Sequence, residues 1–270
     1  MGNACGPSFP LGALFAPGEI RGERSFAVGK STLSPRLAAI EQLMVPRACV
    51  ADVGCDHGYL IAALVSRGKV QRGLACDLRT GPLSRARQTL EEQGLLDRVE
   101  LVLTDGLTGL ENRGVDGIVI AGMGGDLISE ILAAAPWVKD PGIHLVLQPM
   151  SKPQVLREFL AREGFQVLRE QALEDGGHHY TALSAHWDGM SRTLTPLQAL
   201  GGKLLENRDL ASARLLAHLS QVQQRKGEGL AKGGATQLAQ QAFDLAKQLE
   251  DASLRMEDHC KERKKKEGSL

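Results

Sequence analysis

The stretch Asp52-Val53-Gly54-Cys55-Asp56-His57-Gly58-Tyr59 decides how this 270-residue chain folds. It completes the short apolar run Cys49–Val53, which is too short for a helix and ends at a glycine, so we expect a buried strand there. The pattern predicts a helix over Tyr59–Ser66, directly after the glycine-containing turn. A strand, a tight turn and a helix in succession are typical of the first half of a βαβ unit.

The same alternation continues as far as Arg162. Further strands are expected at Gly73–Cys76, Val99–Leu103, Gly117–Ala121 and Ile143–Leu147, with helices after Ser34-Pro35, Gly81-Pro82 and Gly125 and over Pro153–Arg162. Alternating strands and helices predict a parallel sheet with helices on both faces. Two last runs, Phe165–Leu173 and Tyr180–Trp187, flank a turn-rich segment and predict a hairpin that makes the far edge antiparallel. We expect about seven strands in all.

Beyond Thr195-Pro196 the strand signals stop. Leu204–Val222 and Leu238–Met256 carry apolar residues at helical spacing, and the glycine-rich segment Gly227–Gly234 separates them. This pattern predicts an antiparallel helical hairpin whose apolar seams bury each other.

Composition limits the class of protein. Lys+Arg and Asp+Glu are both 32, but residues 31–190 carry 15 basic and 20 acidic side chains, whereas residues 201–270 carry 13 and 10. An acidic body with a mildly basic tail is compatible with a polyanionic partner.

The five cysteines form no CxxC pair, which indicates a reducing compartment and hence a cytoplasmic protein. No apolar run is long enough to span a membrane. We also expect no metal, because the adjacent His178 and His179 cannot easily share one ion.

Acidic residues and glycine turns follow four consecutive expected strands. They are Asp52 to Gly54, Asp77, Asp105-Gly106 and Gly122 to Gly125. Since ligands bind at the carboxyl ends of parallel strands, these residues should share one site. Carboxylates accept hydrogen bonds from ribose hydroxyls and an adenine amino group. Asp56 stands where a dinucleotide-binding turn has its middle glycine, and its charge opposes a pyrophosphate. The pattern therefore favours S-adenosylmethionine, a cation without phosphate, over NAD.

Four motifs carry a family resemblance: Asp-Val-Gly-Cys-Asp-His-Gly-Tyr-Leu from Asp52, Thr-Asp-Gly-Leu at 104–107, Ile-Ala-Gly-Met-Gly-Gly at 120–125 and Leu-Gln-Pro-Met at 147–150. Together they resemble the TrmK family of bacterial tRNA (adenine-22-N1)-methyltransferases over residues 33–187. The resemblance implies a class I, Rossmann-like methyltransferase core and a C-terminal coiled-coil-like appendage. The implied organisation is a disordered extension at 1–30, an S-adenosylmethionine-binding domain at 31–190, a tRNA-binding helical hairpin at 195–262 and a basic tail at 263–270.

The resemblance also implies roles for individual residues. The cofactor site would comprise Asp52, Gly54 and Cys55 around the methionine moiety, Asp77 with Leu78 at the ribose, Asp105 and Gly106 at the adenine, and Ala121, Gly122, Met123 and Gly124 between cofactor and target base. Asp77 replaces a glutamate common in the family, which shortens its reach to the ribose. Asp56, His57 and Tyr59 would face the substrate as catalytic residues. In the helical tail, Arg208, Arg214, Arg225 and Lys226 would hold tRNA through its phosphates.

Several alternatives remain open at this level. Asp56 could instead cap the helix that follows it. Tyr180 could be a core residue, and His178 and His179 could be loop residues. The helical tail could be a dimer or packing element rather than a tRNA-binding element. We expect a monomer or a weak dimer. For the whole protein, the alternatives are a small-molecule methyltransferase, a nucleotide-dependent oxidoreductase, and a non-catalytic RNA chaperone that binds S-adenosylmethionine.

Overall fold

The structure, a computed structural model, describes residues 33–267. The extension expected to be disordered, residues 1–30, lies outside the described residues, and so does the end of the expected basic tail, residues 268–270. The strands are β1 (Arg47–Val53), β2 (Val70–Asp77), β3 (Val99–Leu103), β4 (Gly117–Gly124), β5 (His144–Ser151), β6 (Phe165–Asp175) and β7 (His178–Trp187). The α-helices are α1 (Pro35–Leu43), α2 (Tyr59–Ser66), α3 (Thr80–Glu92), α4 (Gly125–Ala133), α5 (Pro153–Arg162), α6 (Pro196–Gly201), α7 (Leu210–Lys232) and α8 (Thr236–Glu267). Two short 3₁₀ helices are η1 (Pro136–Val138) and η2 (Gly202–Glu206).

The seven strands form one mixed sheet in the order β3-β2-β1-β4-β5-β7-β6. Strands β1 to β5 pair in parallel, and β7 pairs antiparallel with both β5 and β6. Therefore β7 alone runs in the opposite direction, and β6 is again parallel to β5. The expected mixed sheet with a closing hairpin is confirmed. The strand order reverses between β1 and β4, so their carboxyl ends flank a topological switch point, where open sheets bind ligands.

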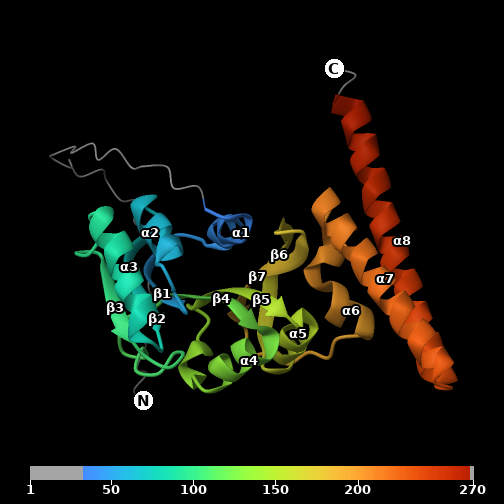
Figure 1. Ribbon diagram of the computed structural model, residues 1–270, viewed down its shortest axis with the longest axis horizontal. Helices are drawn as coiled ribbons and strands as arrows, with labels where there is room; N and C mark the ends of the chain where they lie inside the picture. The colour runs from blue at the N-terminus through green and yellow to red at the C-terminus, as the bar shows by residue number, and fades with distance from the viewer. Residues whose placement is uncertain (1–32, 268–270) are drawn as a thin grey trace, which may run out of the picture. The chain divides into compact units, whose positions relative to one another are not determined.

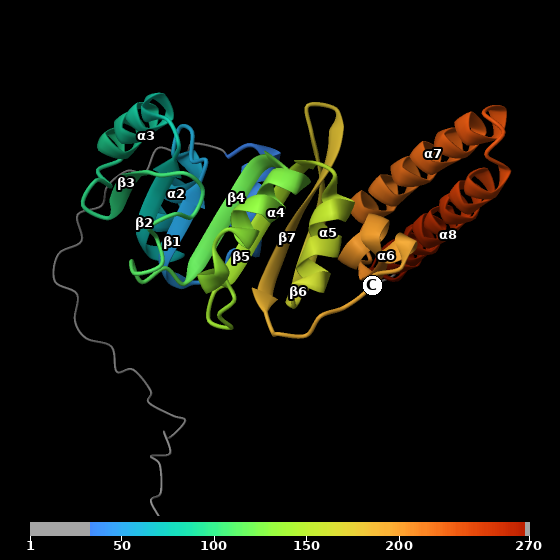
Figure 2. The same cartoon turned by 90° about the horizontal axis from the view of Figure 1, so that it is seen from below.

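Helices cover both faces of the sheet (Figure 1, Figure 2). On one face, α1, α2 and α3 bury residues such as Ile40, Ile61 and Leu90 against Val50 and Val119. On the other face, α4 and α5 lie across β4 and β5 and contribute to a second apolar cluster, with Ile128, Leu132, Leu156 and Phe159 among its members. Val50 and Ala51 point to opposite faces, as successive strand residues must, so the fully apolar run Cys49–Ala51 supplies both clusters.

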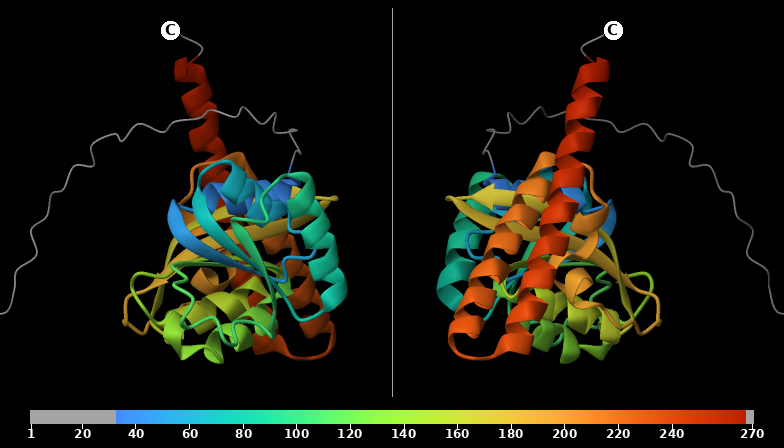
Figure 3. Two further views of the ribbon diagram at one scale, coloured as in Figure 1. Left: turned by 90° about the vertical axis from the view of Figure 1, so that its left-hand side faces the viewer. Right: turned by 90° about the vertical axis from the view of Figure 1, so that its right-hand side faces the viewer.

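The C-terminal helices α7 and α8 pack side by side as an antiparallel hairpin (Figure 3). Their seam buries small and apolar residues including Ala213, Leu216 and Leu249, as the spacing predicts. The hydroxyl of Ser220 donates to the carbonyl of Ala246 at 2.8 Å, which ties the two helices together through a buried polar contact. The coiled-coil character of this appendage stays a prediction.

The predicted boundaries of this hairpin are wrong in three places. The second helix does not end at Met256, because α8 continues to Glu267, into the expected basic tail. The first helix does not begin at Leu204, because η2 occupies that segment and Asp209 caps α7 by accepting from the Ser212 amide at 2.8 Å. Nor does the glycine-rich segment end the helix at Val222, since α7 continues to Lys232. Gly227 is buried inside α7 against the ring of Phe243, and a Cβ there would collide with that ring. The glycine serves close helix packing rather than a turn.

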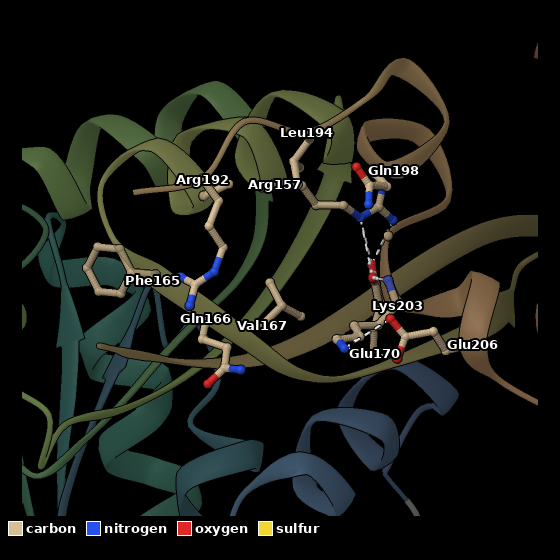
Figure 4. Close-up of a pocket in the computed structure, with 12 residues that line it drawn as sticks. Arg157, Phe165, Gln166, Val167, Glu170, Arg192, Leu194, Gln198, Lys203 and Glu206 are labelled. Atoms are coloured by element: carbon tan, nitrogen blue, oxygen red, sulfur yellow. Dashed lines mark hydrogen bonds and ion pairs between the residues drawn. The ribbon is translucent and has the colours of Figure 1, made fainter. Parts of the chain in front are cut away.

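A buried ion pair joins the helical appendage to the sheet (Figure 4). The guanidinium of Arg157 on α5 donates to Glu170 Oε1 of β6 from Nη2 at 2.7 Å, and both side chains are at most 3% exposed. From Nη1, Arg157 also donates to the carbonyls of Ala199 and Leu200 in α6, at 2.8 Å each. Glu170 in turn accepts from the Lys203 amide at 2.9 Å. The ion pair thus supplies hydrogen-bond partners for two carbonyls at the end of α6 and for an amide at the start of η2. These bonds position the helical hairpin beside β6.

We predict that Arg157→Met destabilises the protein by about 3–5 kcal/mol, because the substitution leaves the Glu170 carboxylate buried and uncompensated. Urea denaturation followed by circular dichroism measures the free energy of unfolding. Arg162→Met on the same helix is the control, since Arg162 is exposed and its ion pair with Glu163 should be worth less than about 1 kcal/mol. Equal stabilities of the two variants would contradict the structural role given to Arg157.

Candidate functional site

The turn after β1 touches the end of β4 at the switch point. Gly54 has φ +74°, and a Cβ at this position would lie 2.5 Å from Cε of Met123. The amides of Gly54 and Cys55 donate to the carbonyl of Cys76 at 2.8 and 3.0 Å, which ties the turn to β2. The positive φ of residue 54 favours glycine, and a side chain there would also displace the terminal methyl group of Met123. The structure brings these two predicted cofactor residues together.

Two carboxylates surround the thiol of Cys55 beneath this turn. Asp52 and Asp77 are 4% and 8% exposed, and Cys55 is 8% exposed. Burial raises the pKa of the Cys55 thiol, and the charges of Asp52 and Asp77 raise it further, so the thiol stays protonated. Asp77 Oδ1 accepts from the Arg79 amide at 2.9 Å. Leu78, between them, is 63% exposed and offers an apolar surface at the end of β2.

Asp52 is a buried acid with an unusual ionisation. Burial raises the pKa of its carboxyl group to about 7, and a hydrogen bond from the backbone of Ile61 at the start of α2 lowers it by a smaller amount. The carboxyl group therefore lies beside the N-terminal turn of α2, which has no side-chain cap of its own. A nearby cation would favour the ionised form of Asp52.

Asp56, His57 and Tyr59 form an exposed group on the next turn. Asp56 has φ +45°, and its Oδ1 accepts from Nη2 of Arg85 on α3 at 2.6 Å. Its Oδ2 lies 3.8 Å from His57 Nε2. The rings of His57 and Tyr59 stack with centroids 5.3 Å apart and planes inclined by 2°. Parallel, half-exposed rings beside a carboxylate can receive a planar base and accept a hydrogen bond from its edge.

The alternative that Asp56 caps α2 is wrong. The N-cap of α2 is Gly58, which makes no side-chain capping bond, and Asp56 pairs with Arg85 instead. Arg85 is a site residue that the sequence analysis missed, because its helical position indicated only an outward-facing side chain. The sequence did contain one signal for this residue, because Arg85 is a basic side chain one helical turn after Pro82, near the start of the helix.

The glycine-rich end of β4 lies on the other side of the crevice that open sheets form at a switch point. The expectation of a turn after Ala121 is wrong, because Gly122 to Gly124 belong to β4, where the pairing with β5 is irregular and the chain bends. The amide of Gly122 donates to Oε1 of Gln148 at 3.2 Å, while Nε2 of Gln148 donates to the carbonyl of Pro149 at 3.0 Å. Gln148 is 1% exposed, so this contact fixes the end of β4 from within β5. Ala121, Met123 and Gly124 are partly exposed along it. Gln148 was also missed as a site residue, although the Leu-Gln-Pro-Met motif contained it.

Asp105 and Gly106 occupy a different part of the same edge. They line a cavity of about 630 Å³ with residues of α4 such as Leu127 and Ile131. The Thr104 amide donates to the carbonyl of Asp77 at 3.0 Å, which links this loop to the end of β2. A smaller cavity, of about 230 Å³, surrounds Arg157 and Glu170 at the other edge of the sheet (Figure 4), and none of the predicted cofactor or catalytic residues lines it.

The four predicted tRNA-binding side chains are all exposed but do not share one face. Arg214 and Arg225 are eleven residues apart on α7, which places them on the same side of the helix. Lys226 lines a groove with Thr195, Pro196 and Leu197, whereas Arg225 lines the opposite groove with residues of α8. Arg208 precedes α7, where its carbonyl lies 3.5 Å from Sγ of Cys260.

Residues 33–267 contain neither a membrane-spanning helix nor a metal-binding cluster. None of the helices in this range is both long and apolar enough to cross a lipid bilayer. The same range contains no group of three or more His, Cys, Asp or Glu side chains placed to hold a metal ion. His178 and His179 begin β7 rather than lying in a loop, so the loop assignment is wrong.

Comparisons with known proteins identify the family of the chain. Residues 33–183 match the family model described as a methyltransferase domain. The tRNA (adenine(22)-N(1))-methyltransferase of Bacillus subtilis is 33% identical over 166 residues, which cover 59% of this chain and 70% of that protein. The crystal structure of the B. subtilis M1A22 tRNA methyltransferase TrmK superposes with a TM-score of 0.69 at 27% identity, covering 83% of this chain and 98% of that one. Streptococcus pneumoniae Sp1610 in complex with S-adenosyl-L-methionine gives a TM-score of 0.69 at 28% identity, over 81% and 99% of the two chains. These structures confirm the expected fold class.

We predict that the stability of the ligand-free protein falls as pH rises from about 4 towards 7, because of Asp52. Its pKa is raised to about 7 in the folded state, so over this range the unfolded chain releases a proton that the folded protein retains. The slope should reach at most about 1.4 kcal/mol per pH unit. Asp52→Asn should remove this part of the decline, measured by urea denaturation from pH 5 to pH 8. The exposed Asp97→Asn is the control and should follow the wild type. Parallel curves for Asp52→Asn and the wild type would refute the assignment.

Proposed function

This chain belongs to the TrmK family of class I methyltransferases, and we propose that it transfers a methyl group from S-adenosylmethionine to N1 of adenine 22 in tRNA. The observation that carries the proposal is the arrangement at the β1/β4 switch point, where the buried Asp52 and Asp77 lie beside the Gly54 turn and the stacked rings of His57 and Tyr59 follow it. B. subtilis TrmK, with which most of the chain superposes, acts at this position in tRNA.

The residues present fit the cofactor. The turn at Gly54 has no side chain to obstruct a ligand, and the carboxyl groups of Asp52 and Asp77 suit a cation with free hydroxyl and amino groups. We propose that Asp52, Gly54 and Cys55 hold the methionine moiety, Asp77 and Leu78 the ribose, and Asp105 and Gly106 the adenine. When bound, S-adenosylmethionine supplies an activated methyl group.

The remaining work of the chain is to orient the target base. Adenine N1 has an in-plane lone pair and needs no base to remove a proton before it attacks, so orientation and stabilisation of positive charge are the main requirements. We assign the stacking of the adenine ring to His57 and Tyr59, and acceptance of its N6 proton to Asp56. Arg85 holds one oxygen of Asp56 and thereby fixes the direction of the other. Ala121 to Gly124 would form the floor between donor and acceptor.

The flipped base must be held against the cost of unstacking, which is a few kcal/mol. We propose that Arg208, Arg214, Arg225 and Lys226 supply tRNA contacts from the helical hairpin, with those on different faces touching different parts of the RNA. A tRNA-modifying role also implies a cytoplasmic location, and we propose that the protein works there as a monomer or weak dimer.

One assay tests the function directly. The full-length protein is incubated with labelled S-adenosylmethionine and unmodified tRNA, and the methylated nucleoside is identified and mapped. The expected product is 1-methyladenosine at position 22. Methylation of a small molecule but not tRNA would support the alternative of a small-molecule methyltransferase, and tRNA binding without methylation would support a non-catalytic chaperone; either result would refute the proposal.

Asp56→Asn should lower the rate of methyl transfer on the order of 10²-fold, because the variant loses the charge that stabilises the cationic product. Asparagine tolerates the positive φ of this position, so the turn itself should be preserved. Single-turnover kinetics with saturating tRNA measures the rate, and calorimetry with S-adenosylhomocysteine should give an affinity within a few-fold of the wild type. A normal rate would remove Asp56 from the mechanism.

Reversing two charges, with Arg214→Glu and Arg225→Glu, should weaken tRNA binding by at least about tenfold at fixed salt, since each lost phosphate contact also changes counterion release. Filter binding or fluorescence anisotropy measures the dissociation constant. Arg255→Glu, an exposed position on α8, provides a control of equal chemistry. S-adenosylhomocysteine affinity should be unaffected in all variants; an unchanged tRNA affinity would show that this face of α7 is not an RNA contact.

A further inference from the structure

Two histidine rings meet outside the cofactor crevice, where β7 begins beside α7. His179 of β7 and His218 of α7 have ring centroids 5.0 Å apart, with the ring planes inclined by 46°. His179 is partly exposed and His218 is exposed. The reaction proposed above uses neither side chain, and His179 comes from the sheet while His218 comes from the helical hairpin. The pair therefore forms a contact between the two parts of the fold that is also open to solvent.

The pair lies at the functional edge of the sheet. Because β6 runs parallel to β5, the turn from β6 to β7 is at the same edge as the carboxyl ends of β4 and β5. On the other face of this hairpin, Arg36 of α1 pairs with Asp175 at 3.0 Å and lies over the ring of Tyr180. Its Nη1 also lies 3.0 Å from Sδ of Met150 at the end of β5. These contacts hold the tip of the β6–β7 hairpin beside the carboxyl end of β5.

The charged groups around the pair are of both signs, with two arginines on the same helical face as His218. Arg214 and Arg225 lie four residues before and seven after His218 on α7, and hence on the same helical face. Burial lowers the pKa of His218, and the neighbouring His179 and Arg225 lower it further. Other charged groups on the surrounding elements are His178 on β7, Glu174 opposite His179 on β6, the paired Asp175, and Lys247, Glu250 and Asp251 of α8 in the groove beside Arg225. Glu174 is thus the acidic side chain placed directly against the pair.

We propose that His179 and His218 together bind a backbone phosphate of the tRNA substrate and become protonated when they do so. The inference rests on the proposed function and assigns a part of the RNA to this site. A phosphodiester carries a permanent negative charge and accepts hydrogen bonds, so it favours the cationic form of any imidazole it contacts. Arg214 and Arg225 then contact the neighbouring phosphates along the same face of α7.

This arrangement couples tRNA binding to proton uptake. A bound phosphate would favour the protonated form of both rings, so the gain in affinity is complete at low pH and is lost as pH rises and the rings release their protons. The His218 environment, which disfavours the charged ring in the free protein, increases the size of the coupling. Because the rings come from β7 and α7, one phosphate would also hold the helical hairpin against the sheet and align the RNA with the crevice.

The test compares the pH dependence of tRNA affinity in full-length proteins. Dissociation constants for unmodified tRNA are measured between pH 6 and pH 8 at fixed ionic strength, with saturating S-adenosylhomocysteine. The wild type should bind about tenfold more weakly at pH 8 than at pH 6. The double variant His179→Gln and His218→Gln should show a nearly flat profile near the wild-type value at pH 8. His186→Gln, on the same strand but paired with Gln166, is the matched control and should keep the wild-type profile.

Two further measurements separate the possible outcomes. Glu174→Gln should tighten binding across the range, because it removes the opposing charge. Calorimetry with S-adenosylhomocysteine should show that all variants keep their cofactor affinity and are folded. If the double variant has the same pH dependence as the wild type, the phosphate site is wrong even though tRNA is bound and methylated. If the wild type neither binds nor methylates tRNA, the proposed function fails with it, and the methylation assay identifies that case.

Discussion

The close approach of the Gly54 turn and the end of β4 at the switch point is the constraint on which the site depends. Gly54 directly follows β1 and Met123 lies near the end of β4, and these two strands are neighbours in the sheet. With no side chain at Gly54, the thioether of Met123 can lie over the first turn, and the amides of residues 54 and 55 can bond to β2. The positions of Asp52 below the turn and of Asp56 above it follow from this geometry. A larger residue at 54 would be strained by the positive φ and would displace the end of the Met123 side chain.

The same turn produces two very different acidic environments within five residues. Asp52 is buried and its pKa is raised to about 7, so its charge depends on what lies beside it. Asp56 is exposed, has an arginine partner and stands beside a ring stack. A buried acid that ionises readily next to a cation suits a sulfonium ligand, and an exposed acid with a fixed orientation suits the amino edge of a base. The roles that we propose for the two residues, Asp52 towards the donor and Asp56 towards the acceptor, would therefore follow from backbone geometry, since both residues are aspartates.

Much of the fold could be predicted from the sequence because its elements are short and strongly patterned. The helix Tyr59–Ser66, the strand Val99–Leu103 and the helix Pro153–Arg162 have the expected bounds, since apolar spacing and flanking glycine or proline define them locally. The extent of α7 could not be predicted in this way. Gly227 weakens a helix by its intrinsic propensity, and only the packing of Phe243 from a distant segment explains why the helix continues through it. At this position tertiary packing outweighs the low helix propensity of glycine.

The candidate site shows the same limit. Its residues that follow strands were accessible from sequence, because every parallel strand delivers its next residues to one edge. Arg85 and the contact between His179 and His218 were not accessible, because each depends on a partner distant in the chain. Gln148 lies in one of the four motifs, but its contact with Gly122 could not be predicted from it. In each case a residue from one element fixes or faces a group on another. Asp56 can be identified from a motif, but the residue that orients it, Arg85, comes from α3. The histidine contact depends on how α7 lies beside the start of β7. The family motifs thus predict the chemistry at the switch point, whereas the tRNA contacts that we propose come from residues of β7 and α7 outside those motifs.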